Sequence, residues 1–301
     1  MPLDLPDCVL TGTDEDLFKA RENLDADGWN KDKAILPVSG QRVQLMLCMI
    51  REEVLELKLG PAALDLETKA ECILRNLKST WQSIPSHLKY DTTKQWTGQT
   101  EYGMMLLAVR LEYLYTEFLL YTLLACYSED SRERLIITAH EIVSIVLSPT
   151  RKRELLHICR AEMEWTLVFY AMPCASVLVL ELLRQNQHPT EQLSINRSGI
   201  IQDISILISC CDSLTESGQS NYQICKQTQS IFSKSLDSIL NQTTPSQRNI
   251  EELTVHHEQN GYMSPGESNV AQDPEWMAWL DSLGLQGDPW LESIIPTLEF
   301  P

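Results

Sequence analysis

Apolar residues recur every three or four positions along most of the chain, which is the period of a helix that buries one face. Between 41 and 59 the repeating apolar positions are Val43, Leu47, Ile50, Val54 and Leu57. The same period predicts further helices over 66–84, 101–127, 132–147, 154–187, 199–214 and 222–240. No alternating run of strand length stands beside them. The pattern therefore predicts an all-α fold.

Residues that begin, end or bend helices stand at the expected places. Gly60, followed by proline, closes the first segment, and Ser128 can cap the fourth. Pro173 lies inside the fifth segment and predicts a kink. The segment 101–127 is apolar nearly all round, so we expect it to be a long buried central helix.

The density of apolar residues divides the chain into four parts. We predict an acidic lead-in over 1–38, an irregular multi-helix domain over 39–240, a linker over 241–272 and a C-terminal tail over 273–301. Apolar residues are sparse in the linker, which cannot bury enough surface to offset the entropy lost on ordering. We therefore expect the linker to be flexible and disordered.

The charge and the cysteines bound the class of protein. The chain has 301 residues, of which 43% are hydrophobic, and a formal net charge of -18. Bulk charge of this sign opposes nucleic-acid binding, which needs a basic face. Nine cysteines, an odd number without a CxxC motif, indicate reduced thiols in a cytosolic or nuclear protein. The acidic N-terminus has no signal-peptide pattern.

Two apolar stretches and several polar pairs have simple interpretations. The stretch 104–124 is interrupted by charges and 165–180 is short, so we expect buried core helices rather than membrane spans. A glycine-rich phosphate loop, GxSxG and HExxH are all missing from the sequence. The pairs His256-His257 and Cys210-Cys211 have no zinc-ligand spacing around them. We expect neither an enzyme nor a metal or cofactor site.

The C-terminal tail combines bulky apolar residues with acids, in the sequence DPEWMAWLDSLGLQGDPWLESIIPTLEFP. Acidic residues that keep aromatic and aliphatic side chains in water are typical of a transcriptional activation segment. Trp276, Leu280 and Leu283 have the spacing of one helical face. The candidate partner-binding residues are Trp276, Met277, Trp279, Leu280, Leu283, Trp290 and Leu291. The alternative is a C-terminal helix that docks on its own domain.

Several segments resemble the regulatory region of fungal binuclear zinc cluster transcription factors, often called the middle homology region. They are PLDLPD with DEDL, DADGWN (25–30), REEVLELKLG (51–60), TWQSIPSHLKY (80–90), LEYLYTEFLLYTLL (111–124) and FYAMPCASVLVLELLRQ (169–185). The tail motif EWMAWLDSLGLQGDPWLE is similar to the family's closing pattern. The resemblance covers most of the chain and implies that 39–240 is a regulatory domain, incomplete on its N-terminal side.

The sequence departs from that family in one important respect. The six-cysteine spacing of the DNA-binding zinc cluster does not occur, so no zinc and no direct DNA binding are expected. The resemblance implies a nuclear transcription regulator that acts through protein contacts. Its partners would be the transcriptional machinery or a co-activator, together with a DNA-binding partner or a second copy of the chain. The alternatives are a cytoplasmic location and a helical small-molecule-binding protein with a non-transcriptional role.

Overall fold

A computed structural model describes residues 23–60, 65–91, 100–151, 160–188, 195–214, 221–241, 274–283, 285 and 291. Helices account for most of these residues, and the described part contains no strand, only an isolated bridge between Leu24 and Asn30. The predicted all-α class is confirmed. Residues 242–272 of the predicted linker (241–272) and most of the tail beyond Leu283 lie outside the described residues.

The helices fall into two compact units, Met1–Cys159 and Arg160–Pro301. The periodicity of the sequence had suggested a single helical domain over 39–240, because it carries no signal for a boundary between two helices. Each unit has its own buried helix, and each is described separately below.

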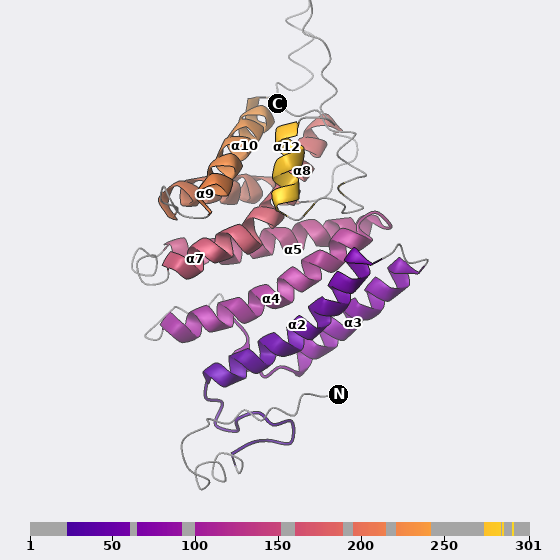
Figure 1. Cartoon of the computed structure of the whole chain (residues 1–301), viewed down its shortest axis with the longest axis vertical. Helices are drawn as coiled ribbons and strands as arrows, with labels where there is room; N and C mark the ends of the chain where they lie inside the picture. The colour runs from indigo at the N-terminus through magenta and orange to yellow at the C-terminus, as the bar shows by residue number, and fades with distance from the viewer. Residues whose placement is uncertain are drawn as a thin grey trace, which may run out of the picture. The chain divides into compact units, whose positions relative to one another are not determined.

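The first unit is built around one helix. Its elements are α2 (Pro37–Leu59), α3 (Leu66–Ser83), the short η1 (Ser86–Leu88), α4 (Thr100–Leu124), α5 (Glu129–Leu147) and η2 (Ser148–Arg151). Helix α4 packs against α2, α3 and α5, which surround it in Figure 1. Leu107, Leu114 and Phe118 of α4 are almost inaccessible to solvent. This confirms the long buried central helix that the apolar run of 101–127 predicted.

Local chemistry sets the ends of these helices. Helix α2 starts at Pro37. Proline has no N–H, but N–H groups in the first turn have no partner within the helix, so no hydrogen bond is lost. It ends at Leu59, and the Gly60 N–H closes the last turn on the Glu56 carbonyl. Ser128 caps α5 as predicted, because its hydroxyl oxygen accepts the Ser131 N–H at 3.1 Å.

The described part of the lead-in begins at Asn23 and forms a tight turn that is attached to α2. The Asp25 carboxylate accepts the Trp29 N–H at 2.8 Å, and Gly28 takes a positive φ of 77°. Arg42 of α2 donates to the Asp27 and Gly28 carbonyls, and its guanidinium lies 3.9 Å from the centre of the Trp29 ring. The turn therefore buries Trp29 against the first helix.

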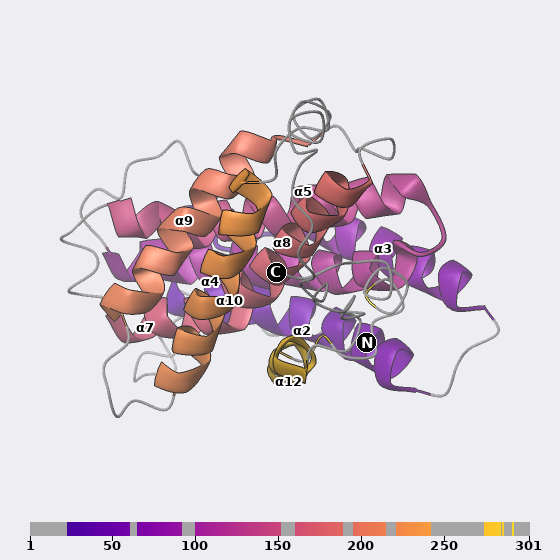
Figure 2. The ribbon, with the colours of Figure 1, turned by 90° about the horizontal axis from the view of Figure 1, so that it is seen from above.

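The second unit has α8 as its most buried element. Its helices are α7 (Arg160–Thr166), the π-helical turn η3 (Leu167–Ala171), α8 (Met172–Gln187), α9 (Arg197–Leu214), α10 (Tyr222–Asn241) and α12 (Pro274–Ser282). Every residue from Met172 to Gln185 is buried. Helices α9 and α10 lie side by side, and both contact α8 (Figure 2).

The helix widens locally just before Pro173. Because proline has no N–H, the Phe169 carbonyl lacks its usual helical donor. The Met172 N–H instead bonds the Leu167 carbonyl, which gives the five-residue π turn η3 just before the proline.

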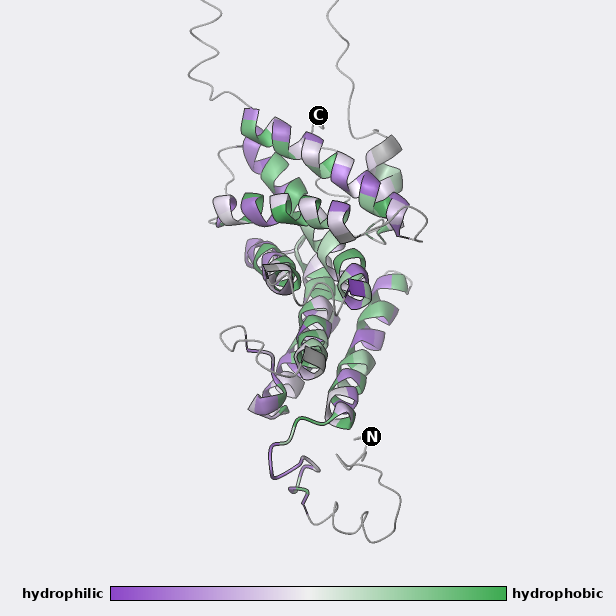
Figure 3. Cartoon of the chain, turned by 90° about the vertical axis from the view of Figure 1, so that its left-hand side faces the viewer, coloured by the Kyte–Doolittle hydropathy of each residue, from purple (hydrophilic) through white to green (hydrophobic). Residues whose placement is uncertain are grey.

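Hydropathy shows how the helices bury their apolar sides. Purple and green sectors share most helices in Figure 3, as amphipathic packing requires. Among the described residues, one continuous helix, Arg160–Gln187, has the length and composition of a membrane span, and 89% of its most apolar window is buried inside the protein. A core helix has this property too, in line with the sequence-based expectation for 165–180.

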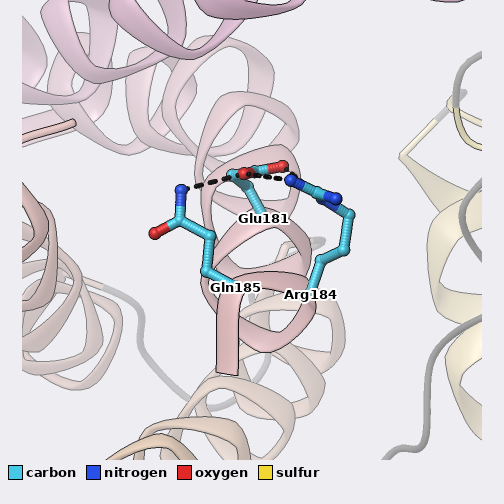
Figure 4. A network of polar contacts seen from close by, with 3 residues as sticks. All are labelled: Glu181, Arg184 and Gln185. Atoms are coloured by element: carbon cyan, nitrogen blue, oxygen red, sulfur yellow. Dashed lines mark hydrogen bonds and ion pairs between the residues drawn. The ribbon is translucent and has the colours of Figure 1, made fainter. Parts of the chain in front are cut away.

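The interior of α8 holds a charged network. Glu181 is fully buried, and its carboxylate accepts hydrogen bonds from Arg184 (3.2 Å) and Gln185 (2.9 Å), as Figure 4 shows. Arg184 is 4% exposed. Two charges taken out of water are costly, and their attraction offsets this cost only while both are present.

Removal of one member of this pair should therefore cost more than removal of both. We expect Glu181→Leu and Arg184→Leu each to destabilise the protein by about 3–5 kcal/mol, and the double substitution to cost less than either. Urea unfolding followed by circular dichroism measures the three effects. Lys226→Ala, which removes an exposed ion pair with Asp212, is the control and should change little. Additive losses in the double variant would contradict the interpretation.

Candidate functional site

The candidate tail forms a short amphipathic helix that is docked on its own unit. Helix α12 packs against α10. Trp276, Trp279 and Leu280 are 4%, 2% and 2% exposed, whereas Asp281 and Ser282 face solvent. The structure therefore describes the docked alternative that the periodicity left open, with the apolar face inward and a carboxylate outward.

Aromatic rings make the centre of this contact. Trp279 meets the fully buried Phe232 of α10 edge to face at 5.4 Å. Trp276 in turn meets Trp279 at 5.4 Å, again nearly perpendicular. Edge-to-face rings are worth roughly 0.5–1.5 kcal/mol beyond the area they bury. The two tryptophans and Phe232 thus form a continuous aromatic chain from the tail helix into α10.

One hydrogen bond fixes the orientation of the central indole. Trp279 Nε1 donates to Thr228 Oγ1 of α10 at 3.0 Å, and both groups are buried. The threonine hydroxyl itself donates a hydrogen bond to the Ile224 carbonyl at 2.8 Å, so its oxygen is free to accept the indole N–H. A buried indole N–H needs an acceptor, so the hydrogen bond to Thr228 fixes the position of the Trp279 ring.

The remaining candidate residues do not all share the predicted face. Helix α12 ends at Ser282, so Leu283 lies in the following turn and is half-buried rather than continuing the face of Trp276 and Leu280. Met277 is half-buried, and Leu291 is buried, as is Leu285, which was not among the candidates. Trp290 lies outside the described residues. Their role in binding a partner remains a prediction.

Sequence reasoning missed Thr228, although a signal for it exists. The buried positions of α10 are Cys225, Thr228, Ile231, Phe232, Ser235, Leu236 and Ile239. Two hydroxyl residues on this otherwise apolar face need hydrogen bonds inside the protein. Ser235 satisfies its hydroxyl on its own helix, through the Ile231 carbonyl. Thr228 also serves as the acceptor for the tail.

Other candidate residues of the sequence can be placed only in part. Among the described residues, no three His, Cys, Asp or Glu side chains lie close enough to hold a metal ion. Cys210 and Cys211 are buried, and a hydrogen bond with Cys225 together with burial raises the pKa of the Cys211 thiol far above its usual range. A thiol in that state is a poor nucleophile. The pair His256-His257 lies outside the described residues.

Exposed apolar side chains gather on α2 and where α7 meets η3. Leu45, Met49, Leu55 and Leu59 share one sector of α2, and Leu59 is 79% exposed. Trp165 and Phe169 are stacked on each other at 4.9 Å and are both partly in solvent. The association with a second copy that the sequence predicts would gain apolar burial on such surfaces.

Comparison of the chain with protein-family models, with curated proteins and with solved structures finds no match in any of the three.

The threonine–tryptophan bond gives a specific test of the docked tail. Thr228→Val keeps the shape but leaves the buried indole N–H without its acceptor, which costs about 1–3 kcal/mol. We expect faster backbone hydrogen exchange across 274–283, measured by mass spectrometry. Ser235→Ala, which removes a buried hydroxyl from the same helix, is the matched control and should leave that exchange unchanged. Equal protection in the Thr228→Val protein would contradict the described dock.

Proposed function

We propose that this chain is a transcription regulator that acts through protein contacts, with the C-terminal tail as its effector segment. The observation that carries the proposal is the character of α12. It is an acidic, aromatic helix whose anchors, Trp276, Trp279 and Leu280, lie together on one apolar face. Helices of this kind bind into apolar grooves of partner proteins. The resemblance to fungal zinc cluster regulatory regions supports the same proposal.

The docked state adds a regulatory step to this proposal. The same face cannot contact α10 and a co-activator at once, because its large side chains are almost completely buried and Trp279 contacts Phe232 and Thr228 of α10. The second unit therefore withholds the tail until it is released. In this scheme the protein works in the nucleus, with the transcriptional machinery or a co-activator as the partner.

Transcriptional reporters test the proposal directly. We expect residues 270–301, fused to an unrelated DNA-binding domain, to activate a reporter, and the whole chain in the same fusion to activate less. Replacing Trp279 and Leu280 by Ala in the tail should abolish activation, because each anchor contributes about 2 kcal/mol when a partner buries it. A double variant as active as its parent would refute the tail as effector.

Release of the tail is tested in the whole-chain fusion. Thr228→Val should raise reporter activity several-fold, since a loss of about 1.4 kcal/mol in the dock shifts its equilibrium tenfold. Ser235→Ala serves as the matched control and should leave activity unchanged. If the isolated tail activates but Thr228→Val has no effect, the effector role stands and the withholding step fails.

A second function is favoured by a separate observation. A polar pocket of about 500 Å3 in the first unit is large enough for a small molecule. It supports the alternative of a helical small-molecule-binding protein.

A further inference from the structure

The pocket lies within the first unit, where the segment after α3 passes the side of the α4–α5 pair. Side chains from residues 86–91 form one wall, and Arg110 of α4 and Glu141 of α5 form the other. The volume is about 500 Å3. Most of the lining groups are polar or charged, with Ile145 as the apolar member. A ligand for such a pocket must therefore be small and polar.

Two cations that line the pocket, Arg110 and Lys89, lie near the same aromatic ring. The Arg110 guanidinium lies 5.3 Å from the centre of the Trp81 ring, and the Lys89 ammonium lies 5.4 Å from it. Trp81 is itself stacked on Tyr113, with the ring centres 4.4 Å apart. The aromatic stack thus holds two positive charges beside the pocket.

The two cations differ in how their charges are balanced. Arg110 forms an ion pair with Glu141 at 2.5 Å and also lies in the field of Glu117. Within the described part of the chain, Lys89 has no carboxylate at ion-pair distance, and its ammonium contacts the neutral Trp81 ring. Asp91 lines the pocket but makes contacts of its own. Burial and the charge of Arg110 both lower the pKa of Lys89. Lys89 is therefore the cation of the pocket lining that lacks a carboxylate partner among the described residues.

The backbone holds Lys89 in place. The Lys89 N–H bonds the Ser86 carbonyl at 3.2 Å, and Leu88 beside it is fully buried. On the other side, the Tyr90 hydroxyl and the Ser148 hydroxyl are 3.2 Å apart, and Ser148 bonds the Ile145 carbonyl at 2.8 Å. This ties the wall to the end of α5. The backbone from which the Lys89 side chain extends therefore loses little freedom when an anion binds.

We propose that this pocket binds a small oxyanion, the carboxylate or phosphate group of a metabolite, with Lys89 as its principal cationic contact and Arg110 as the second. The anion supplies the charge that Lys89 lacks and offsets the repulsion between the two cations. The inference rests on the first unit alone and does not depend on the function proposed for the tail.

Thermal unfolding of the full chain with two probe anions tests the proposal. Inorganic phosphate and citrate are added at constant ionic strength, with chloride as the reference, to the wild type, Lys89→Met and Lys69→Met. Lys69 is an exposed lysine of α3 and serves as the matched control. Both anions stabilise proteins generally by exclusion from their surfaces, so the difference between variants is the readout.

We expect one or both anions to raise the unfolding midpoint of the wild type and Lys69→Met by at least about 2 °C more than that of Lys89→Met, with saturation at millimolar concentration. Phosphate alone, or citrate alone, identifies which oxyanion the site takes. Equal shifts in all three proteins mean general stabilisation only and overturn the proposal. Lys89→Met removes a repelled cation, so without anion it should be at least as stable as the wild type.

A second measurement on the wild type does not depend on the variant folding. Lysines are methylated with 13C-labelled reagent, and the Lys89 signal is assigned by its loss in Lys89→Met. An anion bound to the ammonium favours the charged form and should raise the pKa of Lys89 in the titration of this signal. If neither phosphate nor citrate moves the Lys89 signal more than that of Lys69, the proposal is wrong.

Discussion

Burial of two helices on all sides is the constraint on which the rest of the structure depends. Helices α4 and α8 carry apolar residues around most of their circumference, so neither can face water along one side. Each needs packing neighbours: α2, α3 and α5 pack against α4, and α9 and α10 pack against α8. The division into two units follows, because each buried helix gathers its own set of amphipathic helices.

Local features of the fold were predictable because their causes are local. The cap at Ser128 and the stop at Gly60 depend on residues within one turn, and both are confirmed. Pro173 was identified as a disturbance, but its outcome, a π turn, depends on which carbonyl lost its donor. The clip between Trp29 and Arg42 joins groups thirteen positions apart through a turn, and no periodicity reports it.

The candidate sites depend on contacts between distant parts of the chain, which the sequence pattern does not predict. The tail residues were found from composition, but composition is the same for a free tail and a docked one. The docked position of the tail helix depends on Thr228, which lies more than fifty positions earlier in the chain and accepts a hydrogen bond from Trp279. Lys89 carries no sequence signal at all. The environment of its ammonium group is set by Trp81 and Arg110, which the packing of α3 against α4 brings close to it.

The length of α12 links its fold to its proposed role. It has nine residues, and isolated helices shorter than about 12–15 residues are marginal in water. Its helical form therefore depends on the surface that buries Trp276, Trp279 and Leu280. Helix α10 is one such surface, and a partner's groove would be another. Both surfaces would use the same face of α12, so α12 cannot bind α10 and a partner at the same time. A stronger contact with α10 would therefore weaken the apparent affinity for the partner in the same ratio. A polar acceptor in the dock, rather than a purely apolar one, makes this competition adjustable through a single hydrogen bond.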